Sequence, residues 1–283
     1  MSPPDNLVYR RSHGNVVARR GMTLLELMLA LTISAIMVGS LSVLASATRQ
    51  AAEFNQGQSD SIQHARVVLQ RITRAVGDAY ATEAYPGVVV VDAIVGSYRY
   101  PDTVVIWRPA NGTPTNAAGP PLIKELVIFG PDANDPSQFV EVTCPTDTRT
   151  IQLNDASLNT STGRTLITSL KTATSSVKTV ITKRLKTAAT STGSNSMRAA
   201  IRFECELHPT AAEMTSYRAG SLAWTDIAWP QSIYSSSFGL RQVWLRSELQ
   251  LYDRDKAADG TLPATVATMP FFGSATNYYN LTK

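Results

Sequence analysis

The sequence predicts an α+β fold, in which a long N-terminal membrane-spanning helix packs on an antiparallel β-sheet domain. No proline occurs between Pro4 and Pro86, so residues 22–80 contain no steric break for a helix. After Pro86 the chain changes to short runs of branched and aromatic residues separated by Pro, Gly, Asn and Asp, which are typical of strands and turns. A helix followed by strands is an α+β order, with one helix face covering a sheet.

The charge of the chain is concentrated at its N-terminus. The 283 residues contain 26 Lys and Arg against 22 Asp and Glu, a net formal charge of +4. Residues 1–21 hold four arginines and one acid, so the remainder has 22 basic and 21 acidic residues and a net charge of +1. This even balance argues against a nucleic-acid partner, because such partners require a basic surface on the folded domain.

A segment long enough to cross a membrane follows these arginines. Between Arg20 and Arg49 the only charged residue is Glu26, and Leu27–Thr48 is a run of 22 uncharged residues. About 20 helical residues span the hydrocarbon core of a bilayer. Because the arginines precede the span, the positive-inside rule places the chain from about Arg49 onward outside the cytoplasm.

Two secretory signals compete with an uncleaved span. The small residues 45–47 would allow a signal peptidase to cut after Ala47 and release a soluble β-rich binding domain or enzyme, although the apolar run is longer than an ordinary signal. The arginine pair 19–20 could begin a twin-arginine signal, but residues 21–23 continue it poorly.

The decisive pattern is a short motif that leads directly into the apolar run: Arg19-Arg20-Gly21-Met22-Thr23-Leu24-Leu25-Glu26. It resembles the prepilin signal of type IV pilins and of the pseudopilins of type II secretion, in which a basic leader ends in Gly and Glu is the fifth mature residue. The resemblance implies that prepilin peptidase cleaves the leader 1–21 between Gly21 and Met22 and that Met22 is N-methylated. Residues 22–48 then remain as a transmembrane and filament-core helix.

Glu26 is costly in a membrane segment, by about 2.5–3.5 kcal/mol on insertion scales. The resemblance implies that its partner is the N-terminal amine of Met22 on a neighbouring subunit during assembly. Glu26 would also face the positive end of the helix dipole. The alternative is a carboxylate hydrated among the lipid headgroups.

The helix is expected to continue through residues 49–80 on the periplasmic side. An apolar stripe with helical spacing indicates a packing face, formed by Ile62, Ala65, Leu69, Ile72, Val76 and Ala79. Residues 65–76 also resemble the end of the helix in J-type minor pseudopilins and W-type minor pilins.

Residues 81–283 are predicted to form the β-rich domain. The expected strands are Val88–Ile94, Thr103–Arg108, Leu122–Phe129, Phe139–Thr143, Ile201–Leu207 and Val243–Leu251. The Ser/Thr/Lys-rich segment 160–196 is interpreted as a solvated insertion that includes part of a basic amphipathic helix, with apolar positions at Leu166, Leu170, Ala173, Val177 and Ile181. The alternative is a contact surface for an acidic patch on a neighbouring subunit.

Few residues suggest chemistry in the mature chain. Its histidines are His64 and His208, and no zinc-protease, P-loop, nucleophile-elbow or C-x-x-C motif is present. We therefore predict neither an enzyme nor a cofactor. Two acidic loops are weak calcium candidates and are better interpreted as turns: Asp132, Asn134 and Asp135 in one, and Asp253, Asp255 and Asp259 in the other. Cys144 and Cys205 could form a disulfide in an oxidising compartment, or Cys205 could be a buried apolar residue.

Together these features predict a single-pass inner-membrane protein with most of its chain in the periplasm. The expected function is that of a minor pseudopilin or pilin subunit. Its expected partners are other minor and major subunits, prepilin peptidase and the inner-membrane assembly platform. A tip position in the pseudopilus of a type II secretion system is the main hypothesis. A minor pilin for adhesion or DNA uptake is the alternative.

Overall fold

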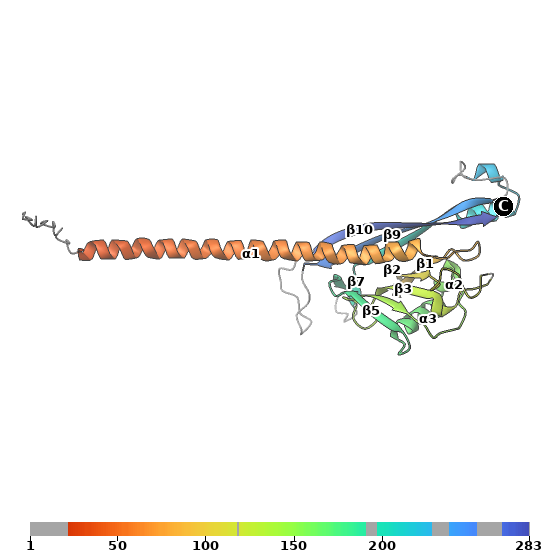
Figure 1. The fold of residues 1–283 in the computed structure, drawn as a ribbon, viewed down its shortest axis with the longest axis horizontal. Helices are drawn as coiled ribbons and strands as arrows, with labels where there is room; N and C mark the ends of the chain where they lie inside the picture. The colour runs from red at the N-terminus through yellow and green to blue at the C-terminus, as the bar shows by residue number, and fades with distance from the viewer. Residues whose placement is uncertain (1–21, 118, 191–196, 228–237, 254–267, 283) are drawn as a thin grey trace, which may run out of the picture. The chain divides into compact units, whose positions relative to one another are not determined.

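The fold is described from a computed structural model, which covers residues 22–117, 119–190, 197–227, 238–253 and 268–282. The chain divides into two compact units, Met1–Glu53 and Phe54–Lys283. Helix α1 (Leu24–Gly77) contributes to both units, and every other helix and strand belongs to the second (Figure 1). The observed order, one long apolar helix and then antiparallel sheets, confirms the predicted α+β class. The predicted leader 1–21 lies outside the described residues.

In the first unit, α1 presents apolar side chains on all sides. Its large apolar residues from Leu24 to Leu44 are 49–78% exposed. Within the described residues this is the one helix long and apolar enough to cross a membrane. A helix that is apolar all around requires an apolar solvent or a ring of protein neighbours.

In the second unit, the last turns of α1 form the centre of the core. The buried residues of α1 are Ser61, Ala65, Val68, Ile72, Ala75 and Val76. The predicted stripe was shifted around the helix: Ile62 is 43% exposed, and Val68 and Ala75 are buried in its place. The shift arises because sheets cover α1 from two directions, which widens its buried face.

Strands β1 to β5 form one antiparallel sheet in sequence order: β1 (Val88–Val95), β2 (Tyr98–Trp107), β3 (Leu126–Pro131), β4 (Phe139–Thr143) and β5 (Val177–Thr182). A 3-10 turn, η1 (Ile123–Glu125), precedes β3, so the predicted strand over 122–129 begins late. Strand β4 has the predicted bounds.

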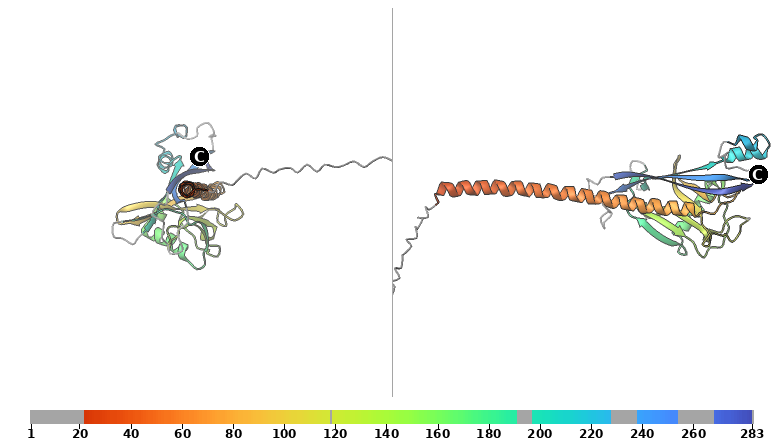
Figure 2. Two further views of the ribbon diagram at one scale, coloured as in Figure 1. Left: turned by 90° about the vertical axis from the view of Figure 1, so that its left-hand side faces the viewer. Right: turned by 45° about the horizontal axis from the view of Figure 1, so that its top comes forward.

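A second sheet has the order β10-β9-β8, with β8 (Ile201–His208), β9 (Phe238–Tyr252) and β10 (Thr268–Thr282). Strands β6 (Thr187–Ala189) and β7 (Met197–Ala199) form a small separate ladder. The views agree that β9 and β10 lie on one side of α1 and the five-stranded sheet on the other (Figures 1 and 2). Short elements complete the domain: α2 (Asp155–Leu158), α3 (Ser161–Thr172), α4 (Ala211–Arg218) and η2 (Trp224–Asp226).

The five-stranded sheet is buried on both faces. On β2, Val104 and Ile106 join the cluster around α1, whereas Val105 and Trp107 join a second cluster on the opposite face. Helix α3 covers this second face through Ile167 and Leu170. Strands covered on both faces are expected to be apolar at consecutive positions, as Val104 to Trp107 are.

The segment 160–196 is therefore not a solvated insertion, although residues 191–196 lie outside the description. The predicted amphipathic helix ends at Thr172. Val177 and Ile181 belong to β5, because residues 177–182 pair with β4, for example Val180 with Val140. The structure corrects this interpretation: the helical spacing across 173–181 was coincidental, and tertiary pairing overrode it.

The predicted disulfide is absent, since Cys144 and Cys205 are both free. Cys144 follows β4 on the same face as Val140 and Val142, and it is buried in the α3-side cluster. Cys205 lies on β8 against the α1-side cluster. The five-stranded sheet lies between the two clusters, so the sulfur atoms cannot approach each other.

We expect two thiols per chain to be alkylated by iodoacetamide in denaturant without reductant. In the native protein both should react slowly, because burial raises the pKa of Cys205 to about 12 and also raises the pKa of Cys144. Mass spectrometry of the detergent-solubilised full chain measures both states. A denatured, non-reduced chain without reactive thiols would show that the cysteines are bonded.

A second prediction concerns Gly163, which lies in the first turn of α3 and approaches the end of α2 closely. A Cβ atom on Gly163 would lie 2.4 Å from the Ser157 carbonyl oxygen and 2.6 Å from that of Leu158. Gly163→Ala should therefore destabilise the domain by about 1–3 kcal/mol, the usual range for overpacking. Gly77→Ala is the matched control, since its Cβ would meet nothing within 4 Å. Equal unfolding midpoints for the two variants would contradict the prediction.

Candidate functional site

The start of α1 is organised by Thr23 and Glu26. The backbone N–H of Thr23 donates to Glu26 Oε2 at 2.9 Å, and the Thr23 hydroxyl donates to the same oxygen at 3.1 Å. In return, the backbone N–H of Glu26 donates to Thr23 Oγ1 at 3.3 Å. This reciprocal pair is a capping box, with Thr23 as the N-cap and Glu26 at the third helical position.

The capping box gives Glu26 a local role in addition to any role between subunits. It satisfies backbone N–H groups that have no partner within the helix, and it places a carboxylate at the positive end of the helix dipole. Within the described residues, the hydrogen bonds to the Glu26 carboxylate come from Thr23 and end on Oε2. The second oxygen, Oε1, is therefore available to an external donor.

Thr23 is a member of this site that was not predicted from the sequence. The signal was present, because Thr23-Leu24-Leu25-Glu26 has the S/T-x-x-E spacing of a capping box before an apolar run. Met22 directly precedes this cap and is 65% exposed. Gly21, the other side of the predicted cleavage point, lies outside the described residues.

The first acidic loop is a turn held by its own hydrogen bonds. Asp132 Oδ1 accepts from the backbone N–H groups of Asn134 and Asp135, and its Oδ2 pairs with Lys178. Burial favours a higher pKa for Asp132, but the bonds from Lys178, Asn134 and Asp135 outweigh it and lower the pKa. These contacts give the acidic side chains of this loop a structural role in the turn.

The second acidic loop is described only in part. Asp253 is buried, and its backbone oxygen accepts from Arg184 Nη1 at 3.2 Å. Asp255 and Asp259 lie outside the described residues. Across the described ranges, no three His, Cys, Asp or Glu residues gather as a metal site would require.

Among the described basic residues, Lys171 has the most strongly shifted pKa. Its Nζ donates to Thr103 Oγ1 at 2.8 Å and to the Pro131 carbonyl oxygen at 3.2 Å. Burial lowers the pKa of Lys171 to about 8, because the charged form loses its hydration. The Thr103 hydroxyl in turn donates to Asp102 Oδ1 at 2.8 Å. This buried polar chain fastens α3 to β2 and β3, which the sequence could not show because Lys171 reads as one of several solvated lysines.

The two histidines of the described chain are not brought together. His64 is half-buried on α1, and His208 ends β8, where its Nε2 lies 3.4 Å from Glu206 Oε2. Among the described residues, neither histidine forms a hydrogen bond with a serine, threonine or cysteine side chain.

Comparison with known proteins identifies the N-terminal segment and no other part of the chain. The family model for the prokaryotic N-terminal methylation motif matches residues 17–42. No curated protein and no solved structure matches the chain. The match covers the predicted cleavage point, the capping box and most of the exposed apolar part of α1. This motif, together with the one candidate membrane helix among the described residues, supports a type IV prepilin-like protein.

Proposed function

We propose that the protein is a minor pseudopilin that assembles through α1 into the periplasmic pseudopilus of a type II secretion system. The observation that carries this proposal is the motif at residues 17–42 on a helix whose large apolar side chains from Leu24 to Leu44 are 49–78% exposed. Burying one such side chain contributes about 1.5–3 kcal/mol. A row of them therefore stabilises insertion into a bilayer first and into a bundle of similar helices afterwards.

The assignment of roles follows from the same segment. Prepilin peptidase removes residues 1–21 and methylates Met22, which gives the mature chain an amine one residue before the Thr23 cap. The free oxygen of Glu26 accepts from the corresponding amine of a neighbouring subunit. The four leader arginines keep the N-terminus in the cytoplasm, so the second unit enters the periplasm.

The J-type assignment and the tip position rest on residues 65–76, whose pattern is similar to J-type and W-type helices. A minor pilin for adhesion or DNA uptake shares the same N-terminal machinery, so it is the second candidate. Members of this motif family are structural subunits, and we assign the protein no catalytic step.

The cleavage point is tested by substituting the residue before the cut. Gly21→Val should leave a precursor about 21 residues longer, because the peptidase site accepts only a small side chain there. Gly14→Val in the same leader is the matched control and should be processed. N-terminal sequencing of the mature membrane protein should begin at Met22 with a methylated amine. A start at Thr48 would instead support release after Ala47.

The charge of Glu26 is tested separately from its capping role. Glu26→Gln keeps a capping-box residue but removes the charge, whereas Thr23→Ala weakens the cap and keeps the carboxylate. A charge-assisted hydrogen bond contributes about 1.5–3 kcal/mol, which corresponds to roughly 10- to 150-fold in association.

We expect Glu26→Gln to be cleaved and inserted but to co-purify with other prepilin-like subunits at least about tenfold less than wild type. Thr23→Ala should retain most of this co-purification. The measurement is made in cells that lack the wild-type gene. If Glu26→Gln co-purifies with other subunits as well as the wild type does, the carboxylate is only a helix cap at the headgroups.

A further inference from the structure

Strand β10 is a long sheet edge with one open side. It pairs with β9 over all 15 of its residues, Thr268↔Tyr252 through Thr282↔Phe238. Among the described strands β10 has no second neighbour, because the sheet order is β10-β9-β8. Its outer side therefore presents unpaired backbone N–H and C=O groups, which form a template for another strand.

The composition of β10 is unusual for an exposed edge. Proteins generally protect such edges with charged side chains, bulges or proline. Residues 268–282 contain no charged side chain, and Pro270 near one end is the only proline. The charges of this sheet are instead on its other strands, for example Arg246 and Glu248 on β9. The open edge of β10 therefore lacks the charged side chains that usually prevent pairing with another strand.

A groove runs beside this edge, between β10 and α1. It has a volume of about 510 Å³ and is lined by residues of α1 from Ile62 to Arg74 together with Phe271. Ile62, Leu69 and Phe271 provide apolar surface, and Arg66 and Arg74 are the charged residues of its lining. Gly273 permits β10 to lie close to α1, since a Cβ at this position would lie 2.6 Å from Leu69 Cδ2.

The two rim arginines are available to a partner. Arg74 forms a long ion pair with Asp78, with 3.8 Å between Nε and Oδ2, and 84% of the Arg74 side chain is exposed. Arg66 has no ion-pair partner among the described residues and is exposed. An apolar groove with this rim is complementary to a segment that carries apolar residues and a carboxylate.

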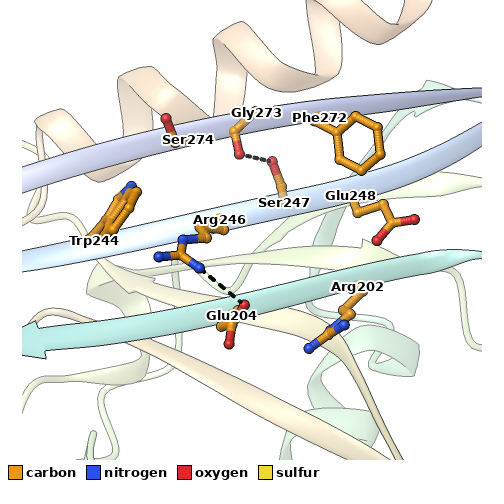
Figure 3. Close-up of a pocket in the computed structure, with 9 residues that line it drawn as sticks. All are labelled: Arg202, Glu204, Trp244, Arg246, Ser247, Glu248, Phe272, Gly273 and Ser274. Carbon is orange, nitrogen blue, oxygen red and sulfur yellow. Dashed lines mark hydrogen bonds and ion pairs between the residues drawn. The ribbon is translucent and has the colours of Figure 1, made fainter.

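Aromatic side chains flank the same edge on the opposite face of the sheet. Phe272 is 70% exposed and Tyr278 is 48% exposed. Figure 3 shows Phe272 on β10 at the margin of a surface pocket, whose far end holds Trp244 with Arg246 stacked 4.0 Å above its ring. A strand added to the edge would place its outward side chains next to Phe272 and Tyr278, where cross-strand pairs stabilise a sheet.

We propose that the free edge of β10 accepts an extended strand from a neighbouring prepilin-like subunit, which becomes a fourth strand of this sheet. The strand contributes main-chain hydrogen bonds to β10. Its inward side chains fill the groove, and a carboxylate among them pairs with Arg66 or Arg74. This inference rests on the proposed function, because it requires neighbouring subunits.

A second copy of this chain is a poorer occupant. Antiparallel pairing of β10 with itself would reverse the direction of residues 54–77 of α1 in the second copy, whereas subunits of one filament share a direction. The strand β10 also carries no carboxylate for Arg66. A different subunit with an apolar strand that carries a carboxylate can keep the shared helix direction and also pair with Arg66.

The test uses the full-length chain in cells that lack the wild-type gene, with the photocrosslinker p-benzoylphenylalanine in place of Tyr278. We expect an adduct with another prepilin-like chain, and the crosslinked peptide should come from an extended segment. Thr276→Lys puts a charge on the edge and Arg66→Glu reverses the rim. Each substitution should reduce the yield of the adduct at least about tenfold, which corresponds to a loss of about 1.4 kcal/mol in binding free energy.

Two matched variants control for charge alone. Gln250→Lys lies on the central strand β9 and faces the same side as Thr276, and Lys124→Glu reverses a charge on η1 outside the groove. Both should leave the adduct unchanged. Unfolding midpoints of the four variants establish that each is folded.

An adduct with a second copy, an adduct with a protein of another class, or equal loss in Gln250→Lys and Thr276→Lys would overturn the proposal. Co-purification of the wild-type chain, which keeps Tyr278, distinguishes failure of the β10 edge proposal from failure of the proposed function. If the wild type co-purifies with other subunits but no adduct forms, only the β10 edge proposal fails. If the wild type does not co-purify, the filament function itself fails.

Discussion

The second unit depends on the burial of one face of α1 between Ser61 and Val76. Inner residues of both large sheets pack against this face, so the helix and the two sheets share one core. The Ser61 hydroxyl donates to the Tyr252 carbonyl oxygen at 2.8 Å and ties the helix to the end of β9. Small residues such as Ala65 and Ala75 allow this close approach on two sides.

This arrangement explains why the five-stranded sheet requires a second cover. With α1 on one face, the other face would expose Val105, Trp107 and Ile128 to water. Helix α3 covers part of that surface together with Ile151, Leu153 and Leu158. Lys171 fixes the position of α3 through Thr103 and the Pro131 carbonyl group. A buried lysine with satisfied hydrogen bonds tolerates only a narrow set of geometries, so it orients α3 more strictly than apolar packing would.

The two ends of α1 meet different requirements within one continuous helix. Its N-terminal residues carry a capping box that satisfies the helix start wherever that start is located, in lipid or among other helices. Its last turns are amphipathic and serve a folded domain. The uncharged edge of β10 lies beside these last turns, so the helix and the sheet edge offer a neighbouring chain one continuous surface.

The sequence alone determined the features that depend on local order along the chain. These are the apolar span, the motif around Gly21, Met22 and Glu26, and the strands with clear alternation, such as β8 and β9. A motif and a period of two or 3.6 residues are properties of neighbouring residues, so they need no knowledge of the fold.

Only the tertiary structure decided which faces meet. It separated Cys144 from Cys205 across a sheet, turned Val177 to Ile181 from a helix into β5, buried Lys171, and made the β10 segment a 15-residue strand despite its glycine and asparagines. Each outcome depends on pairing between residues far apart in the chain. Local propensity is weaker than a full ladder of hydrogen bonds or a buried face, and for that reason the sequence could not predict them.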